Sequence, residues 1–240
     1  MAALDPNSFQ YTLFLSLTII LLIVKTLLTL YILRKILEKK KETGQFKIDF
    51  VFGMFILFIC LIISRVIYIY FDFFLTYFDS EVYYKHVLYW KLGFLPSAVG
   101  LAVVNYILDK KILNFKLKGI TAYMILGGAI LVLFWPVNSQ EEFQTISAIS
   151  FISSAGTILI PIIFIYLGIK IPGLRKTAFM ITIGFAIYAL GPILVNDAIL
   201  DVLRTAYGEE MHVIIFFLFI TLKIIGLIII SYSVTKFRLV

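Results

Sequence analysis

The sequence contains few of the side chains that hold metals, haem groups or disulfides. It has one cysteine, Cys60, so an intramolecular disulfide is excluded and the cysteine content does not indicate a redox compartment. It has two histidines, His86 and His212, and neither belongs to a Cys or His pair at metal-ligand spacing. We therefore expect no metal site and no paired histidine ligands for a haem, and we interpret both histidines as interfacial residues.

Motifs typical of enzymes and of separate domains are also missing. The chain has no Ser-His arrangement, no glycine-rich phosphate loop, no pair of aspartates within an apolar run and no Gly-x-Ser motif of the rhomboid type. Linkers and low-complexity segments are absent, and Met1 to Gln10 lack the basic residues of a cleavable signal peptide. We expect a single domain over residues 1–240 that is not an enzyme and needs no cofactor.

Apolar residues, in contrast, dominate the composition. They make up 62% of the 240 residues and raise the mean hydropathy to +1.04, whereas a soluble domain is about half apolar. A helix needs about 20 apolar residues to cross a bilayer, and open strands would leave their backbone groups unpaired in lipid. The sequence therefore predicts an all-α integral membrane protein, a seven-transmembrane-helix bundle. The predicted helices cover residues 10–34, 49–71, 87–108, 119–136, 145–169, 176–197 and 211–235.

Charges alternate in sign along the loops between the predicted helices. The loops after the first, third and fifth helices and the C-terminal tail are basic, and the other three loops are mainly acidic. Because basic loops stay in the cytoplasm, this pattern predicts the N-terminus outside and the C-terminus cytoplasmic, in the cell membrane. The net charge of +7 comes from these short loops and does not indicate nucleic-acid binding. The acidic residues at the predicted outer side are Asp72, Asp79, Glu81, Glu141, Glu142, Asp197, Asp201, Glu209 and Glu210.

Small residues and prolines predict how the helices pack. Small side chains let two helices approach closely in lipid. In the predicted third and sixth helices they are Gly93, Ser97, Gly100, Gly184, Ala186, Ala189 and Gly191. Pro96, Pro161 and Pro192 lie within predicted helices three, five and six. Each proline removes a backbone hydrogen bond, so we expect a kink at each position and an opening between helices beside it.

Three basic residues lie inside predicted helices, where a charge is costly and marks a candidate functional site. Lys25 lies in the inner half of the first helix, Arg65 in the outer half of the second, and Lys223 near the middle of the seventh. These helices are neighbours in a closed ring, so the three cations are predicted to line one cavity. No acidic residue lies at the same depth. Arg65 can instead reach outward to Asp72 or to a tyrosine such as Tyr68 or Tyr70, and Lys25 can extend to the inner headgroups. Lys223 is too central for this and needs a carbonyl cluster, a water cavity, a hydroxyl or an anionic ligand, or it must be neutral.

The run Leu222-Lys223-Ile224-Ile225-Gly226-Leu227 resembles the stretch at the Schiff-base lysine of microbial rhodopsins, as does its place in a seventh helix. The resemblance implies retinal bound to Lys223, with carboxylate counterions in helix three and one turn before the lysine. Here residues 89–96 contain no acid, and Phe219 takes the second position. We therefore judge retinal on Lys223 unlikely.

Aromatic residues make up 16% of the chain and are densest around the predicted second loop. Trp90, in this aromatic cluster, and Lys91, next to it near the start of the third helix, are candidate ligand-binding residues, because the cluster is dense enough to cap a cavity that opens outward. The alternative is an aromatic belt that anchors the helices at the membrane interface.

These features leave three functions open. The first is a receptor-like or sensory protein that binds a small or lipidic ligand and acts through a partner. The second is a small transporter, channel or lipid-binding subunit for an anionic substrate, and the third is an accessory subunit of a larger complex. The expected partners are the lipid bilayer and a cytoplasmic signalling protein or other membrane subunits. The candidate binding residues are Lys223, Arg65, Lys25, Trp90 and Lys91.

Overall fold

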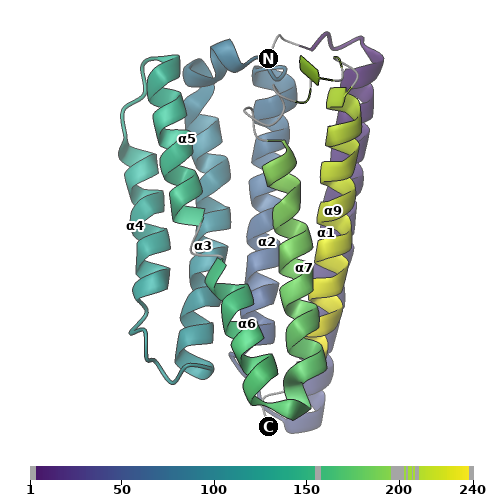
Figure 1. The fold of residues 1–240 in the computed structure, drawn as a ribbon, viewed down its shortest axis with the longest axis vertical. Coiled ribbons are helices and arrows are strands. Elements are labelled where there is room, and N and C mark those ends of the chain that lie inside the picture. The colour runs from purple at the N-terminus through teal and green to yellow at the C-terminus, as the bar shows by residue number, and fades with distance from the viewer. Residues whose placement is uncertain are drawn as a thin grey trace.

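A computed structural model describes residues 4–154, 158–195, 203, 205–206, 208 and 211–237. Within these ranges the chain is all α-helical, with no strand, and the helices run up and down along one common direction (Figure 1). The elements are α1 (Phe9–Thr43), α2 (Phe50–Ile69), the π-helical turn η1 (Tyr70–Leu75), the 3-10 turn η2 (Ser80–His86), α3 (Val87–Lys111), α4 (Ile120–Phe134), α5 (Gln140–Ser154), α6 (Leu159–Lys170), η4 (Pro172–Leu174), α7 (Arg175–Leu194) and α9 (Met211–Lys236).

Five helical segments are long and apolar enough to cross a membrane, which supports a multi-pass membrane protein. They are Phe9–Thr43, Phe50–Leu75, Ser80–Lys111, Pro172–Leu194 and Met211–Lys236. Ile120–Phe134 and Leu159–Lys170 are equally apolar in character but shorter. The predicted helical class is thus confirmed, and five of the predicted spans correspond to helices long and apolar enough to cross a membrane. The predicted fourth and fifth spans do not meet the length of a spanning helix as they stand.

The predicted fifth span, 145–169, is described as two helices instead of one. α5 begins earlier than expected, at Gln140, and packs beside α4, whereas α6 packs beside α7 (Figure 1). Residues 155–157, between them, lie outside the described residues. Pro161 stands in the first turn of α6, where backbone N–H groups have no helical partner to lose. Pro96 and Pro192 do lie inside α3 and α7, as predicted.

The end of the predicted sixth span and the loop after it lie largely outside the described residues. α7 ends at Leu194, short of the predicted residue 197. The acidic residues that support the outer assignment of this loop therefore have no structural account. They are Asp197, Asp201, Glu209 and Glu210.

Glycines bring two helix pairs into close contact, one through Gly100 of the predicted third span and the other through Gly226, which the sequence analysis did not single out. A Cβ atom on Gly100 of α3 would lie 2.9 Å from the Cβ of Cys60 in α2. A Cβ atom on Gly226 of α9 would lie 2.7 Å from the backbone nitrogen of Tyr188 in α7. Distances this short leave no room for any side chain, so α2–α3 and α7–α9 pack backbone to backbone.

The buried core is in two parts. The larger part runs between α1, α2, α6, α7 and α9 and includes Phe14, Met54, Phe164 and Ile230. The smaller part joins α3 to α4 through short side chains such as Ala98, Ala122 and Ala129. Side chains from α1 and α9 meet across the bundle, where Tyr31 Oη lies 3.1 Å from Thr235 Oγ1.

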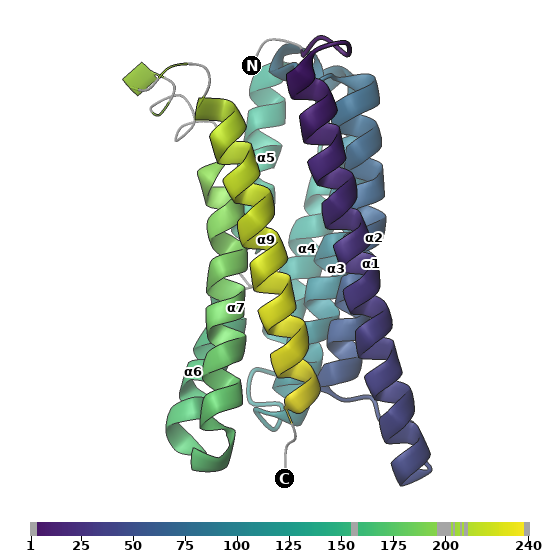
Figure 2. The ribbon, with the colours of Figure 1, turned by 90° about the vertical axis from the view of Figure 1, so that its right-hand side faces the viewer.

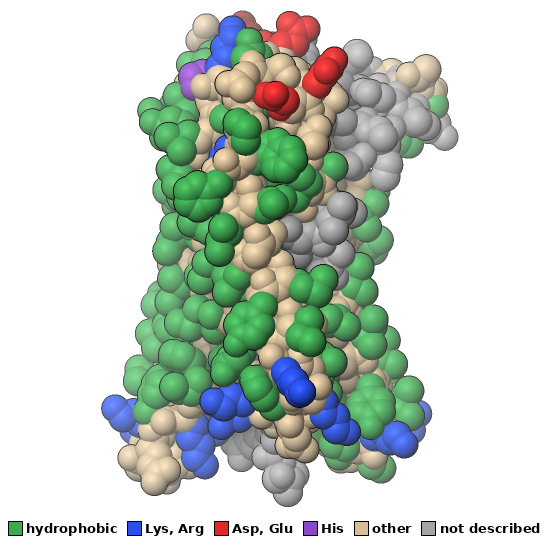
Figure 3. Space-filling view, turned by 90° about the vertical axis from the view of Figure 1, so that its left-hand side faces the viewer, with side chains coloured by type: hydrophobic (Ala, Val, Ile, Leu, Met, Phe, Trp, Pro, Cys, Tyr) green, Lys and Arg blue, Asp and Glu red, His purple; other side chains and the backbone are tan. Residues whose placement is uncertain are grey.

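Charged side chains collect at the two ends of the bundle. Figure 3 shows an apolar band with acidic side chains above it and most of the lysines and arginines below it. The N-terminus lies at the acidic end and the C-terminus at the basic end (Figure 1). α1 is 35 residues long, about 52 Å at the α-helical rise, and it extends past the end of α9 at the basic side (Figure 2).

Candidate functional site

Four charged residues from different elements form one group inside the bundle, which we call the interior charge cluster. They are Lys25 of α1, Arg65 of α2, Asp72 of η1 and Lys223 of α9. Arg65 interacts electrostatically with Lys25 and Asp72, and Lys223 interacts with all three of the others. The three cations that the sequence placed in separate helices are therefore brought together, as predicted. The carboxylate among them was expected only at the outer edge.

Lys25 is held by backbone. Its residue is 3% exposed, and its Nζ donates to the carbonyl oxygen of Leu61 in α2 at 3.3 Å. A buried ammonium needs such an acceptor, because an isolated charge in an apolar interior costs several kcal/mol. Lys25 is thus a cation with one protein partner on the neighbouring helix, and it does not extend to the headgroups.

Arg65 links α1 to η1. Its Nη2 donates to Thr18 Oγ1 at 3.0 Å, and its Nη1 lies 3.8 Å from Oδ2 of Asp72. The side chains are only 13% and 19% exposed. The expected outward contact from Arg65 to Asp72 is confirmed. Its Nε is buried and has no hydrogen-bond partner among the described residues, so the guanidinium retains one free donor.

Asp72 reaches the interior because the second helix continues further than predicted. The sequence ended this span at residue 71, but the π-helical turn η1 carries it to Leu75. π turns inside membrane-length helices are uncommon and often occur at functional sites. Tyr11 Oη, from α1, donates to the carbonyl oxygen of Phe73 at 3.0 Å, which holds this turn against the bundle.

Lys223 differs from the other cations because its ammonium has no polar partner. Nζ lies 4.2 Å from the ring centre of Phe219 and 5.6 Å from that of Tyr188. Its stem packs on Gly191, where a Cβ would come within 3.3 Å of the lysine Cγ. Within the described part of the chain, no carboxylate pairs with this ammonium and no acceptor receives a hydrogen bond from it. The residue is half-buried at the α7–α9 contact.

Basic residues outnumber acidic residues in the cluster. Three cations face a single carboxylate, and this carboxylate is 3.8 Å from Arg65. Water cannot screen charges inside an apolar bundle as it does at a surface, so the excess favours an anion beside Lys223. The groups in the cluster are suited to binding an anion by charge and by hydrogen bonds.

Trp90 and Lys91, the other two predicted binding residues, lie apart from this cluster. Lys91 Nζ donates to the carbonyl oxygens of Trp135 at 2.5 Å and Leu133 at 3.4 Å, at the end of α4. A cation there satisfies carbonyls that the helix leaves unpaired. Trp90 stacks on Phe94 of its own helix with ring centres 6.0 Å apart, and it meets Phe143 of α5 edge to face at 5.2 Å. The structure therefore assigns both residues packing contacts between α3 and its neighbours.

The two histidines lie in different surroundings. His212 is 7% exposed, and its ring meets that of Phe14 edge to face at 4.9 Å. It is therefore buried in the bundle, in the first turn of α9. His86 ends the short turn η2. Among the described residues, no group of three or more His, Cys, Asp or Glu side chains is arranged to hold a metal ion.

No protein-family model, curated protein or solved structure matches the chain. The functional argument therefore rests on the chemistry of the interior charge cluster.

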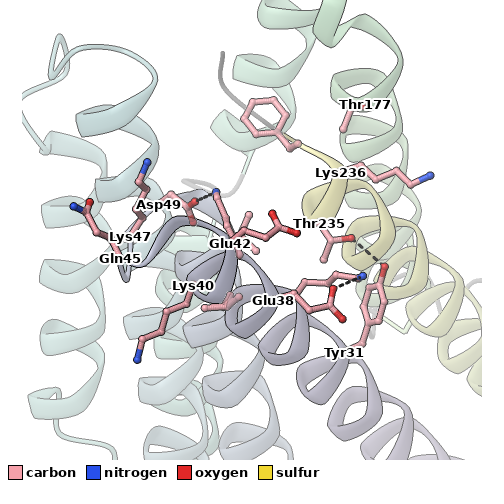
Figure 4. A pocket seen from close by; sticks show the side chains of 15 residues that line it. Tyr31, Glu38, Lys40, Glu42, Gln45, Lys47, Asp49, Thr177, Thr235 and Lys236 are labelled. Atoms are coloured by element: carbon pink, nitrogen blue, oxygen red, sulfur yellow. Dashed lines mark hydrogen bonds and ion pairs between the residues drawn. The ribbon is translucent and has the colours of Figure 1, made fainter.

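A pocket of about 620 Å³ opens at the basic end between α1, α2, α7 and α9 (Figure 4). Part of its charge is paired within the protein, whereas Lys40, Lys47 and Lys236 line it without an ion pair among the described residues. Lys39 Nζ lies 2.5 Å from Oδ2 of Asp49, and Glu38 pairs with Arg34 and Lys35 on its own helix. The Lys39–Asp49 pair joins α1 to the start of α2. The unpaired lysines of the pocket are exposed, so water screens their charge, and the pocket is a weaker candidate for an anion than the interior charge cluster.

The sequence analysis did not identify the apolar and aromatic residues that contact Lys223, although the sequence contains a signal for one of them. Phe219 lies four residues before Lys223, and residues at this spacing share one face of a helix. Tyr188 and Gly191 belong to another helix, so their contacts with Lys223 depend on how α7 packs on α9.

Proposed function

We propose that this protein spans the membrane seven times and binds a small anion or an anionic headgroup in the interior charge cluster. The single observation that carries the proposal is the ammonium of Lys223. It is half-buried in the bundle, faces aromatic rings and has no acceptor within the described residues. Arg65 and Lys25, two further basic residues, interact electrostatically with it. A bound anion removes the imbalance that these residues create.

The proposed orientation has the N-terminus outside and the C-terminus in the cytoplasm of a cell. Its support is the separation of charge in Figure 3, because basic segments stay on the cytoplasmic side. In this proposal α4 supplies the fourth span, and α5 and α6 together supply the fifth. α4 has 15 residues, about 22 Å, so it needs its flanking residues or a locally thin bilayer to cross.

The proposed mode of action is receptor-like. Lys223 lies where α7 and α9 touch, since its stem packs on Gly191. A ligand at the ammonium therefore acts on the contact between these two helices. α9 is tied to α1 near the basic end through Tyr31 and Thr235, and α1 extends beyond the bundle there (Figure 2). This path leads to a surface where a cytoplasmic partner can respond.

The test is ligand-induced stabilisation of the purified protein, because anything that binds only the folded state raises its stability. The probes are chloride, phosphate, succinate and a short-chain fatty acid, each tested on the wild type and on Lys223→Met. The matched control is Lys236→Met, which removes an exposed lysine that also stands over an aromatic ring of α9, that of Tyr232. We expect at least one anion to stabilise the wild type and Lys236→Met but not Lys223→Met. Equal responses of all three proteins would count against the proposal.

A second candidate function is transport of the anion, and one observation favours it. Helices interrupted near the middle of the membrane are typical of transporters, and α5 and α6 are separate helices that pack on different neighbours. Uptake of a labelled anion into proteoliposomes distinguishes the two. Uptake that is lost in Lys223→Met but kept in Lys236→Met indicates transport, whereas binding without uptake indicates a receptor.

A further inference from the structure

A second cavity lies on the outside of the bundle, far from Lys223 in the chain, and we call it the α2–α3–α4 groove. Its volume is about 710 Å³. One face of α3 forms its floor, and side chains of α2 and α4 form its walls. The residues that characterise it are Phe52, Val99, Tyr106, Lys110, Tyr123 and Leu126.

The groove has the length of one membrane leaflet. Along α3 its lining runs from Val99 to Lys111, a rise of about 18 Å. Half of a bilayer's hydrocarbon core is about 15 Å thick. The apolar part of the groove, between Val99 and Tyr106, therefore lies at the depth of acyl chains when its lysines lie at the headgroups.

The polar end of the groove carries two exposed lysines without acidic partners. Lys110 and Lys111 both line it and are exposed, and no described carboxylate lies within ion-pair distance of either. The ammonium of Lys110 lies 5.8 Å from the ring centre of Tyr106, at the boundary between the basic end and the apolar floor.

The nearest carboxylate, that of Asp109, is used elsewhere. Asp109 is fully buried, and its two oxygens accept hydrogen bonds from the backbone N–H groups of Leu117 at 2.9 Å and Gly119 at 2.6 Å. It holds the turn between α3 and α4, where Gly119 has a φ of 74°. The lysines of the groove therefore remain available, in contrast to Lys39 of the pocket in Figure 4, which is paired with Asp49.

We propose that the α2–α3–α4 groove binds one anionic phospholipid of the inner leaflet, with an acyl chain along α3 and its phosphate at Lys110 and Lys111. Basic residues at the inner end of a groove between membrane helices attract anionic headgroups, and the apolar floor removes the chain from contact with bulk lipid. The site is independent of the interior charge cluster, because the two share no residue.

The test is the number of lipids that remain on the intact protein in native mass spectrometry. The protein is offered equal amounts of phosphatidylglycerol and phosphatidylcholine with identical acyl chains. We expect the wild type to retain phosphatidylglycerol in preference. The double variant Lys110→Gln/Lys111→Gln is expected to lose this preference by about fivefold per lysine. The matched control is Lys116→Gln/Lys118→Gln, which removes two lysines of the same turn that do not line the groove.

A second variant tests the apolar part. Val99→Trp fills the floor at a residue that is 37% exposed, so the fold tolerates the larger side chain, and Ile130→Trp is the control on the outer face of α4. We expect Val99→Trp to lose phosphatidylglycerol although both lysines remain. Retention that is equal in the wild type, the lysine double variant and Val99→Trp would overturn the proposal, as would equal retention of phosphatidylcholine.

Discussion

The lysine side chains inside the two sides of the bundle have different partners. On the α3–α4 side, Lys91 donates to two carbonyl oxygens at the end of a helix, and it completes a structure that needs a cation there. On the α7–α9 side, Lys223 stands over two aromatic rings with no polar acceptor among the described residues. Both residues were candidate binding residues in the sequence analysis. The difference teaches that a buried charge indicates a ligand site only when the protein itself leaves it without a partner.

Lys25 and the pair of Arg65 and Asp72 lie between these extremes. Lys25 has one carbonyl acceptor, and Arg65 has a hydroxyl and a carboxylate but keeps its Nε free. The residues of the interior charge cluster therefore differ in how many polar partners the protein provides, and Lys223 has the fewest among the described residues. The following predictions use this order, beginning with the largest expected effect.

Removing the carboxylate from the cluster has the largest expected effect. Asp72→Asn leaves three buried cations without an acidic partner, and we expect the free energy of unfolding to fall by about 3 kcal/mol, since the Arg65–Asp72 contact is partly buried. The measurement is thermal unfolding in detergent micelles. The double variant Arg65→Met/Asp72→Asn is expected to recover more than half of the loss. No recovery would mean that Asp72 stabilises η1 by itself and not through Arg65.

The backbone contact between α7 and α9 has the next largest expected effect. Gly226→Ala places a Cβ 2.7 Å from the Tyr188 nitrogen, and we expect a loss of about 2 kcal/mol because the two helices must separate. Gly127→Ala in α4 is the control, since nothing lies within 4 Å of its Cβ, and it is expected to be neutral or to stabilise its helix slightly. Equal melting temperatures of the two variants would contradict the close packing.

Replacing Lys91 or Lys223 has the smallest expected effect on the free energy of unfolding, but the two changes are expected to have opposite signs. Lys91→Met removes a helix-end cation, and we expect a loss of about 1 kcal/mol. Lys223→Met replaces an unpartnered ammonium by a side chain of similar length, and we expect a gain of about 1 kcal/mol, as is common when a functional residue is removed. The measurement is thermal unfolding of both variants without ligand. Opposite signs support the comparison, and a loss at both positions would refute it.

Much of the fold was predictable because it depends on local properties of the chain. Long apolar runs predict helices where lipid cannot pair backbone groups, and this holds for the five segments of membrane length. Gly100, Gly184 and Gly191 were predicted to bring helices together, and each lies against a neighbouring helix. The fourth and fifth spans were less predictable, because helix length and continuity there depend on which neighbour each segment packs against.

The sequence by itself determined that the chain forms apolar helices, that three cations lie within them and that charge of opposite sign marks their ends. Only the tertiary structure decided that Lys25, Arg65, Asp72 and Lys223 form one electrostatic group, that Lys91 binds carbonyl oxygens at the end of α4, and that Lys223 has no polar partner among the described residues. The physical reason is the range of the forces involved. Hydropathy and loop charge act on each segment alone, whereas the partner of a buried charge is chosen by the packing of helices that are distant in the chain.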